Sequence, residues 1–225
     1  MQEKTARVVG IAVACVALLI AGSAEADKGG LAVCSAELAA CTADLAALEA
    51  AARVPQTGQV TSFAVRDDGD LEVGAPLPTP RFTDNGDGTV TDNRTKLIWL
   101  KDAGCLGLKT WAAALTSASG LASGACNLSD GSVAGDWRLP NVLELFSLLN
   151  FEFIPVAVSN TAGTAPWTPG DPFTGELGQD TTFWSSTTYP GNTTLAYVVL
   201  PTTGTNGANE KTDGGSNAWP VRGGK

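Results

Sequence analysis

The sequence predicts an α+β domain that is preceded by a short N-terminal coiled-coil helix. A seven-residue spacing of apolar residues over residues 31–52 indicates the helix. From residue 81 onward, short β-branched and aromatic runs alternate with Gly- and Asn-rich turns and with two helical segments, which is typical of a mixed domain. A chain of 225 residues is long enough for one such domain and its appendages.

Residues 1–26 have the pattern of a signal peptide. Lys4 and Arg7 provide the basic start, residues 8–21 are apolar, and Ala24-Glu25-Ala26 is the small-residue cleavage site. The apolar stretch is short for a membrane span, so the pattern favours cleavage over an uncleaved anchor. We therefore expect an exported bacterial protein, secreted or at the cell surface, with no membrane span in the mature chain.

Residues 27–53 are predicted to form a coiled-coil stalk. Both core positions are filled over about three heptads, one by Leu31, Leu38, Leu45 and Ala52 and the other by Cys34, Cys41 and Leu48. The stalk predicts a homo-oligomer, and its core residues are compatible with two or three strands. The alternative is one amphipathic helix that packs on its own domain, but Pro55 directly after the run favours a protruding stalk.

Export permits disulfide bonds, and four of the five cysteines remain after cleavage because Cys15 lies within the signal peptide. Cys34 and Cys41 are about 10 Å apart along a helix, too far to bridge each other. They either bond across chains or are small apolar core residues. Cys105 and Cys126 bracket a helical segment and are predicted to form an intrachain disulfide.

Residues 54–80 are predicted to be a linker, and residues 81–225 the globular domain. The glycines and prolines of the linker preclude a long regular element, and Asp67, Asp68 and Asp70 suit exposed turns. In the domain, residues 82–91 predict a β-hairpin and residues 97–100 a buried strand. Later strands are expected at residues 182–188, 195–201 and 218–222.

Two helices are predicted between these strands. Thr110 is a suitable N-cap for a helix that starts at Trp111, and Asn141 with Glu144 forms a capping box for a second helix. Residues 155–181, by contrast, are rich in Pro, Gly, Thr and Asp. A loop of that length inside a compact domain is usually functional.

The composition excludes several classes of function. The formal net charge is -9, and it stays -9 after cleavage because residues 1–26 contain two basic and two acidic residues. An acidic protein repels phosphate backbones, so nucleic acid is excluded as a partner and strongly sulfated polysaccharides are disfavoured. The chain has no histidine, the usual general base near neutral pH and the commonest zinc ligand. We expect no enzyme, no cofactor and no metal.

Several motifs in the domain occur in an order that resembles a known family. They are RFTDNGDGTVTDN at residues 81–93, LIWLKDA at 97–103, GDWRLPN at 135–141 with Glu144 and Leu145, FWSST at 183–187 and VRGG at 221–224. Over about residues 81–224 the sequence is similar to the Lcl C-terminal domain family. The resemblance implies a C-type-lectin-like fold in which the first and last strands pair, two helices flank the sheet and a long loop carries the ligand site.

The resemblance also has implications for the oligomeric state and for the ligand. The family's named member is the trimeric tip of a bacterial collagen-like adhesin that binds sulfated glycosaminoglycans, so a trimer is implied here. The acidic charge of this chain departs from what a polyanion binder needs. Related lectin-like folds include the formylglycine-generating oxidases, which need a reactive cysteine pair. Because Cys105 and Cys126 are expected to be a structural bridge, catalysis is not expected.

Two other stretches invite a functional interpretation that the pattern does not favour. Residues 84–92 have the Asp, Asn and Gly content of a calcium loop, but Gly86 and Gly88 stand where oxygen ligands are needed. The Glu-Pro-Asn triplet of calcium-dependent lectins is also missing, so a plain hairpin turn is expected. Trp137, Arg138 and Asn141 lie between a glycine turn and a capped helix and are expected to stabilise the fold.

The candidate ligand-binding residues lie in the long loop and just after it. They mix aromatic faces with hydrogen-bonding groups near one end of the predicted sheet, as a carbohydrate site would: Trp167, Asp171, Asp180, Tyr189 and Asn192. We expect a trimeric adhesin or binding protein that recognises a glycan or an extracellular protein through this face. The alternative is a structural subunit or cap of an extracellular assembly that is cross-linked through Cys34 and Cys41.

Overall fold

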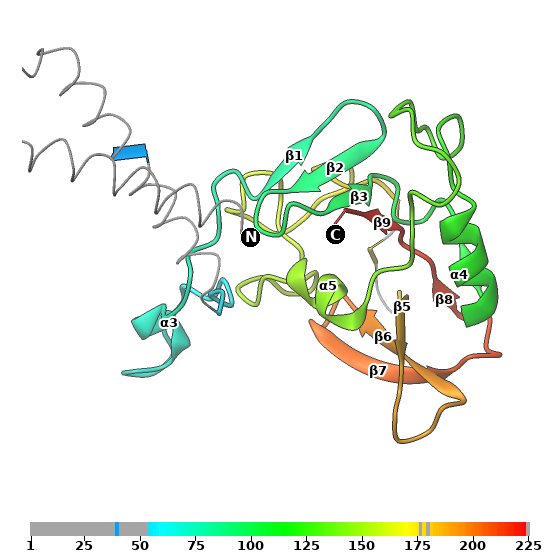
Figure 1. Ribbon diagram of the computed structural model, residues 1–225. Coiled ribbons are helices and arrows are strands. Elements are labelled where there is room, and N and C mark those ends of the chain that lie inside the picture. Colours follow the sequence, from blue (N-terminus) through cyan, green and yellow to red (C-terminus); the bar gives the residue numbers. More distant parts are fainter. Residues whose placement is uncertain (1–38, 41–53, 176, 179–180, 224–225) are drawn as a thin grey trace, which may run out of the picture. The chain divides into compact units, whose positions relative to one another are not determined.

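The computed structural model describes residues 39–40, 54–175, 177–178 and 181–223 (Figure 1). The chain divides into two units, residues 1–54 and residues 55–225, and the fold below is that of the second unit. The predicted signal peptide lies outside the described residues. So does the predicted stalk, including Cys34 and Cys41, apart from Ala39 and Ala40, which are helical.

The first sheet contains the predicted hairpin and the end of the chain. Its order is β1-β2-β3-β9, with all neighbours antiparallel. The strands are β1 (Phe82–Asp84), β2 (Thr89–Asp92), β3 (Ile98–Leu100) and β9 (Val221–Arg222). The hairpin at residues 82–91 and the buried strand after it are thus confirmed. The last strand pairs with β3, whereas the resemblance implied that the first and last strands pair.

The second sheet has the order β4-β8-β5-β6-β7 and combines one parallel pair, β5 with β8, with antiparallel pairs. Its strands are β4 (Leu108–Lys109), β5 (Phe183–Thr188), β6 (Leu195–Leu200), β7 (Thr205–Glu210) and β8 (Ser216–Asn217). The sequence did not indicate β7, which contains Asn and Gly. Pairing along all of β6 nevertheless makes it a strand. The single strand expected at residues 218–222 is wrong, because β8 and β9 belong to different sheets and residues 218–220 join them.

In residues 55–223, as far as the structure describes them, the sheets are accompanied by the helices α3 (Asp68–Leu71), α4 (Trp111–Ser119) and α5 (Val142–Ser147). Thr110 caps α4 and accepts from the backbone N–H of Ala113, as predicted. The capping box of α5 is also present, with Asn141 and Glu144 each bonded to the other's backbone N–H. The exposed turns expected at residues 67–70 are instead one short helix, because the Asp67 carboxylate accepts from the N–H of Asp70.

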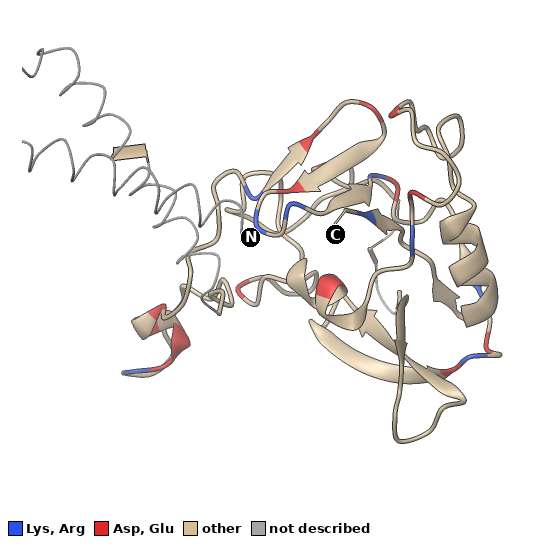
Figure 2. Cartoon of the chain, in the orientation of Figure 1, with Lys and Arg blue, Asp and Glu red and all other residues tan. Residues whose placement is uncertain are grey.

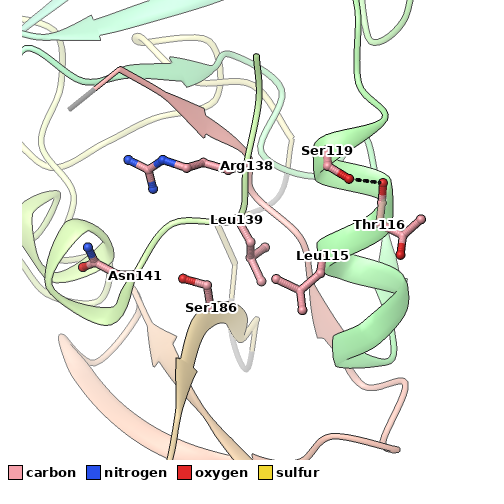
Figure 3. A pocket seen from close by; sticks show the side chains of 7 residues that line it. All are labelled: Leu115, Thr116, Ser119, Arg138, Leu139, Asn141 and Ser186. Carbon is pink, nitrogen blue, oxygen red and sulfur yellow. Dashed lines mark hydrogen bonds between the residues drawn. The ribbon is translucent and has the colours of Figure 1, made fainter. Parts of the chain in front are cut away.

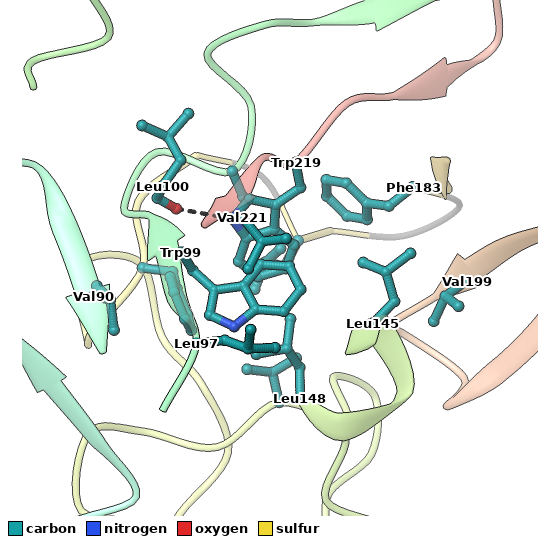
Figure 4. Close-up of a cluster of buried hydrophobic side chains, with 14 of the residues drawn as sticks. Val90, Leu97, Trp99, Leu100, Leu145, Leu148, Phe183, Val199, Trp219 and Val221 are labelled. Carbon is teal, nitrogen blue, oxygen red and sulfur yellow. Dashed lines mark hydrogen bonds between the residues drawn. The ribbon is translucent and has the colours of Figure 1, made fainter. Parts of the chain in front are cut away.

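The main core joins the two sheets through aromatic rings (Figure 4). Trp219, fully buried, lies with its ring centroid 5.3 Å from that of Trp99 on β3, 4.9 Å from Phe173 in the long loop and 5.1 Å from Phe183 on β5. Its indole N–H donates to the carbonyl of Leu100 at 2.8 Å. Residues 218–220 therefore connect the sheets and also place the ring that packs between them.

A buried ion pair holds the start of the domain against the first sheet. The side chains of Arg81 and Asp92 are 2% and 0% exposed and are joined through both guanidinium NH groups. The same guanidinium donates to the carbonyl of Ser147 at the end of α5, at 2.6 Å. Because both charges are desolvated, replacing either partner alone is expected to destabilise the domain.

Candidate functional site

A groove lies between α4, residues 138–141 and β5, and its volume is about 520 Å³. Figure 3 shows Leu115 and Leu139 close together at its centre, Arg138 and Asn141 on one side, and Thr116 and Ser119 on α4 on the other. Ser186 of β5 completes the lining. The size is that of a small-molecule site, and the lining combines an apolar floor with polar groups around it.

The positions of α4 and of residues 138–141 beside the groove follow from how each segment packs. Ala114 and Ala118 pack against the second sheet and are fully buried, so Leu115, Thr116 and Ser119 are left on the part of α4 that borders the groove. Residues 138–141 are fixed on two sides. The backbone of Arg138 exchanges two hydrogen bonds with Val221 of β9, at 3.0 and 2.9 Å, and the N–H of Ser186 donates to the carbonyl of Pro140 at 2.7 Å.

The charge in the groove is neutralised within the wall itself. Arg138 forms a two-pronged contact with Glu144, at 2.7 and 2.6 Å, and donates to the carbonyl of Gly223 at 3.1 Å. The hydrogen bond to Glu144 raises the pKa of Arg138 above its usual value. Burial alone would raise the pKa of Glu144, but the hydrogen bonds from Arg138 and from the Asn141 N–H outweigh it, and the pKa is lowered. Both groups are therefore charged near neutral pH, and they cancel.

The polar groups around the floor have capacity left for a ligand. The Asn141 side-chain oxygen caps α5, but its amide NH₂ has no partner among the described residues, and neither has the Ser186 hydroxyl. The Thr116 and Ser119 hydroxyls donate back to carbonyls of α4, at 3.0 and 3.1 Å, which leaves their lone pairs free to accept. The groove thus offers both donors and acceptors above an apolar surface.

Two further hollows flank the disulfide and share Asp102. One, of about 580 Å³, reaches Cys105 and Thr181, and the other, of about 320 Å³, reaches Cys126 and Lys101. The Asp102 carboxylate already accepts from the N–H of Gly104 at 3.1 Å. Glycine accounts for three of the eight residues that line the first hollow and two of the seven that line the second, so each presents five side chains against the seven of the groove beside α4.

The comparison with family models matches residues 88–222 to the Lcl C-terminal domain. The match covers more than half of the 225 residues. The chain belongs to the Lcl C-terminal domain family. No curated protein and no solved structure was found to match. In this Lcl C-terminal domain, Arg138, Leu139 and Asn141 of the groove lie within the matched range, and so do Leu115, Thr116, Ser119 and Ser186.

The structure places the long-loop candidates beside the first sheet, with their polar groups largely used inside the loop. The Trp167 indole N–H donates to the carbonyl of Phe173 at 3.0 Å, and the ring packs against the main core. The Asp171 carboxylate accepts from the N–H of Thr161 at 2.9 Å and from its hydroxyl. The carbonyl of Thr161 in turn accepts from the N–H of Phe82 on β1. These residues fold the loop onto β1.

The remaining candidates lie elsewhere. Tyr189 and Asn192 are in the turn between β5 and β6, at the opposite end of the domain from the long loop in Figure 1. The ring of Tyr189 stands edge-on to Tyr197, with 5.4 Å between centroids, and the Asn192 side chain accepts from the N–H of Thr194. Asp180 lies outside the described residues. The structure therefore does not bring Trp167 and Asp171 together with Tyr189 and Asn192.

Cys105 and Cys126 form the predicted intrachain disulfide, with 5.8 Å between their Cα atoms. At the turn of the β1–β2 hairpin, Asp84 pairs with Lys101 at 2.6 Å; this hydrogen bond lowers the pKa of Asp84 despite partial burial. Within the described ranges, no group of three or more acidic or cysteine side chains is arranged to hold a metal ion. In the same part of the chain, no helix has the length and apolar character to cross a membrane.

The sequence pattern does not indicate the groove as a site, although it draws attention to Arg138 and Asn141. Arg138 and Asn141 were expected to stabilise the fold, and the ion pair and the capping box confirm that role. What the pattern could not show is that Thr116 and Ser119, on another helix, lie across from them. The only local signal was the small and hydroxyl-bearing composition of residues 112–119 on α4, which leaves room beside the helix.

Proposed function

We propose that this member of the Lcl C-terminal domain family is an exported, oligomeric adhesin-like protein whose groove beside α4 binds a neutral glycan. The observation that carries the proposal is the make-up of the groove. Leu115 and Leu139 lie together at its centre (Figure 3), and the residues that line it around them carry an amide and three hydroxyls: Asn141, Ser186, Thr116 and Ser119. Family membership supports the broader statement that the protein is extracellular and adhesin-like.

A saccharide fits this lining better than an apolar ligand does. Each sugar hydroxyl both donates and accepts, and the groove offers the donors of Asn141 and Ser186 and the lone pairs of Thr116 and Ser119. The C–H face of a pyranose ring would cover Leu115 and Leu139 and remove their side chains from water. A purely apolar ligand would leave the polar groups without partners, which is costly.

The charges favour a neutral glycan over a sulfated one. The Arg138 guanidinium is held by the Glu144 carboxylate, so the groove has no free cation to attract sulfate. The net charge of -9 adds a general repulsion of polyanions. This separates the proposed ligand from the sulfated glycosaminoglycans that the family resemblance suggests.

Export and oligomeric display complete the proposal. The predicted signal peptide and the predicted stalk support a secreted or surface-held homo-oligomer, which we take to be a trimer because of the family. Several copies of a weak site on one assembly would give useful avidity. We propose a C-type-lectin-like fold, supported by family membership, by helices α4 and α5 beside the sheets and by the long loop.

Binding is proposed rather than catalysis. Cys105 and Cys126 are bonded to each other, so they do not supply the thiols that formylglycine-generating oxidases use. The chain also has no histidine to act as a general base near neutral pH. The alternative function, a structural subunit cross-linked through Cys34 and Cys41, depends on residues outside the described ranges.

A screen of the purified exported oligomer on a glycan array tests the proposal. The array holds neutral and sulfated glycans, and it is probed in calcium, in EDTA and at two salt concentrations. We expect binding to neutral saccharides that neither EDTA nor salt removes. Binding confined to sulfated glycans and lost with salt would contradict the charge argument, and a blank array would contradict glycan recognition. A Tyr189→Ser variant in the same screen tests the residues that the sequence alone suggested.

A further inference from the structure

Residues 55–75, which we call the neck loop, form an ordered element that adds almost nothing to the core. Its ends meet, because Pro55 bridges to Ala75 and the N–H of Gln56 donates to the Ala75 carbonyl at 2.9 Å. Among residues 54–80, which are described throughout, only Gly69 is buried. Any side chain at Gly69 would lie 2.2 Å from the Thr61 carbonyl oxygen, so the loop is tightly folded back on itself.

Hydrogen bonds hold the neck loop against the turn after α5. The carboxylate of Glu152 accepts from the backbone N–H groups of Val60 and Thr61 at 2.8 and 3.0 Å, and the N–H of Phe151 donates to the Thr57 carbonyl at 3.0 Å. Bonds from the Thr61 hydroxyl and from these N–H groups lower the pKa of Glu152. The loop therefore has a defined place on the domain, although its large apolar side chains do not anchor it.

The large apolar side chains of this region face solvent. The structure describes eleven exposed large apolar side chains, and seven of them lie on the neck loop or on the turn that it contacts: Val60, Phe63, Val65, Leu71, Val73, Phe151 and Ile154. Phe63 is 78% exposed and Val65 is 89% exposed. Single exposed apolar residues are ordinary, but a concentration of this kind marks an interaction surface.

We propose that the neck loop and the turn at residues 151–154 are a contact surface between copies of this chain. The inference rests on the self-association in the proposed function but not on the ligand. The predicted stalk ends at residue 53, two residues before the loop begins at Pro55. A parallel coiled coil brings equivalent residues of its strands together, so it delivers the neck loops of different copies to the same place.

The neck loop offers one complementary charge contact to an identical surface. Arg66 is the one basic residue of the neck loop and lies beside four acidic residues, Asp67, Asp68, Asp70 and Glu72, so the loop has a net charge of -3 (Figure 2). In a symmetric assembly the same patch contributes to each interface, and a surface with both signs can place Arg66 of one copy against α3 of the next.

The test is sedimentation velocity of the exported chain over a concentration series, with a reductant to open any bonds between Cys34 and Cys41. Phe63→Ser with Val65→Ser removes two exposed side chains of the neck loop. Val133→Ser with Leu143→Ser removes two that are 62% and 75% exposed elsewhere on the domain. We expect the neck variant to weaken association by about 100-fold, about tenfold for each deleted side chain, and the control to associate like the wild type.

The outcomes separate the inference from the proposed function. A wild type that associates, with a neck variant that associates equally well, would overturn the inference and leave the oligomer standing. A wild type that stays monomeric would overturn both the neck-loop contact and the proposed oligomer. Glycan binding by the groove is tested by the array and does not depend on this result. Val65→Cys is expected to form a disulfide between copies that Val133→Cys does not form. Retention of the wild type on phosphatidylglycerol vesicles, lost in the neck variant, would instead show a lipid as the occupant.

Discussion

Removal of the Asp92 carboxylate should destabilise the domain more than any other single conservative change in the β1–β2 hairpin. Asp92 is fully buried, and its partner Arg81 is 2% exposed. Asp92→Asn keeps the size of the side chain but leaves the guanidinium as a buried charge without a counter-ion. The neutral groups beside the guanidinium, which include the Ser147 carbonyl at 2.6 Å and the Phe82 ring at 4.4 Å, do not replace that counter-ion.

The magnitude follows from the desolvation of both groups. Breaking one side of a buried pair costs about 3–5 kcal/mol in the free energy of unfolding. In a domain of this size, 1 kcal/mol lowers the Tm by about 2–4 °C, so a loss of roughly 6–20 °C is expected. Thermal unfolding followed by circular dichroism, together with the urea midpoint, measures the change.

Asp84→Asn is the matched control, because it makes the same chemical change in the same hairpin. Lys101 and Asp84 are 28% and 38% exposed, and a pair of that kind contributes less than about 1 kcal/mol. Equal losses in the two variants would refute the reasoning from burial. Adding Arg81→Met to Asp92→Asn should recover part of the stability, since it removes the stranded charge.

Three further predictions concern the elements around the candidate site. Cys105→Ser with Cys126→Ser should lower the free energy of unfolding by about 3 kcal/mol, from the entropy of a loop with a sequence separation of 21, and a urea titration measures it. Gly88→Ala should cost more than Gly86→Ala in the same assay: both have positive φ, worth about 1–2 kcal/mol each, but only at Gly88 would a Cβ lie 2.4 Å from the backbone oxygen of Asn127. Because the folded-state pKa of Glu144 is lowered from 4.5, its contribution to stability is present above that value and is lost as the pH falls through the folded pKa. The difference in stability between the wild type and Glu144→Gln should therefore be largest near pH 7 and vanish in acid, and a difference that persists unchanged to low pH would contradict the ion-pair explanation.

Local signals predicted the parts of the fold that depend on residues near one another in the chain. Thr110 and Asn141 cap their helices because each bonds to an N–H only three residues away, and the spacing of Asn141 and Glu144 is visible in the sequence. The turn at Gly86 and Gly88 is local in the same way. Tertiary pairing explains the misses. Strand β7 forms because its backbone pairs with β6 along the whole length of that strand. Residues 218–220 connect the second sheet to the first because Trp219 packs in the core between the two sheets.

The candidate site was less predictable because three distant segments build it. Residues 115–119, residues 138–141 and Ser186 come together only after α4 and β5 have packed. The residue types chosen from the long loop were reasonable for a sugar site, but Asp171 uses its carboxylate to hold Thr161. Composition shows which groups a loop contains. Whether those groups face a ligand or one another depends on the loop's own hydrogen bonds.

The most direct test of the account is a glycan-array comparison of three oligomers, the wild type, Thr116→Arg and Ala113→Arg. Both variants add one long cationic side chain to an exposed position of α4, but only Thr116 lines the groove. The account predicts that the wild type and Ala113→Arg bind the same neutral glycans and that Thr116→Arg binds none of them. Equal binding by all three proteins would place recognition outside the groove and contradict the central claim.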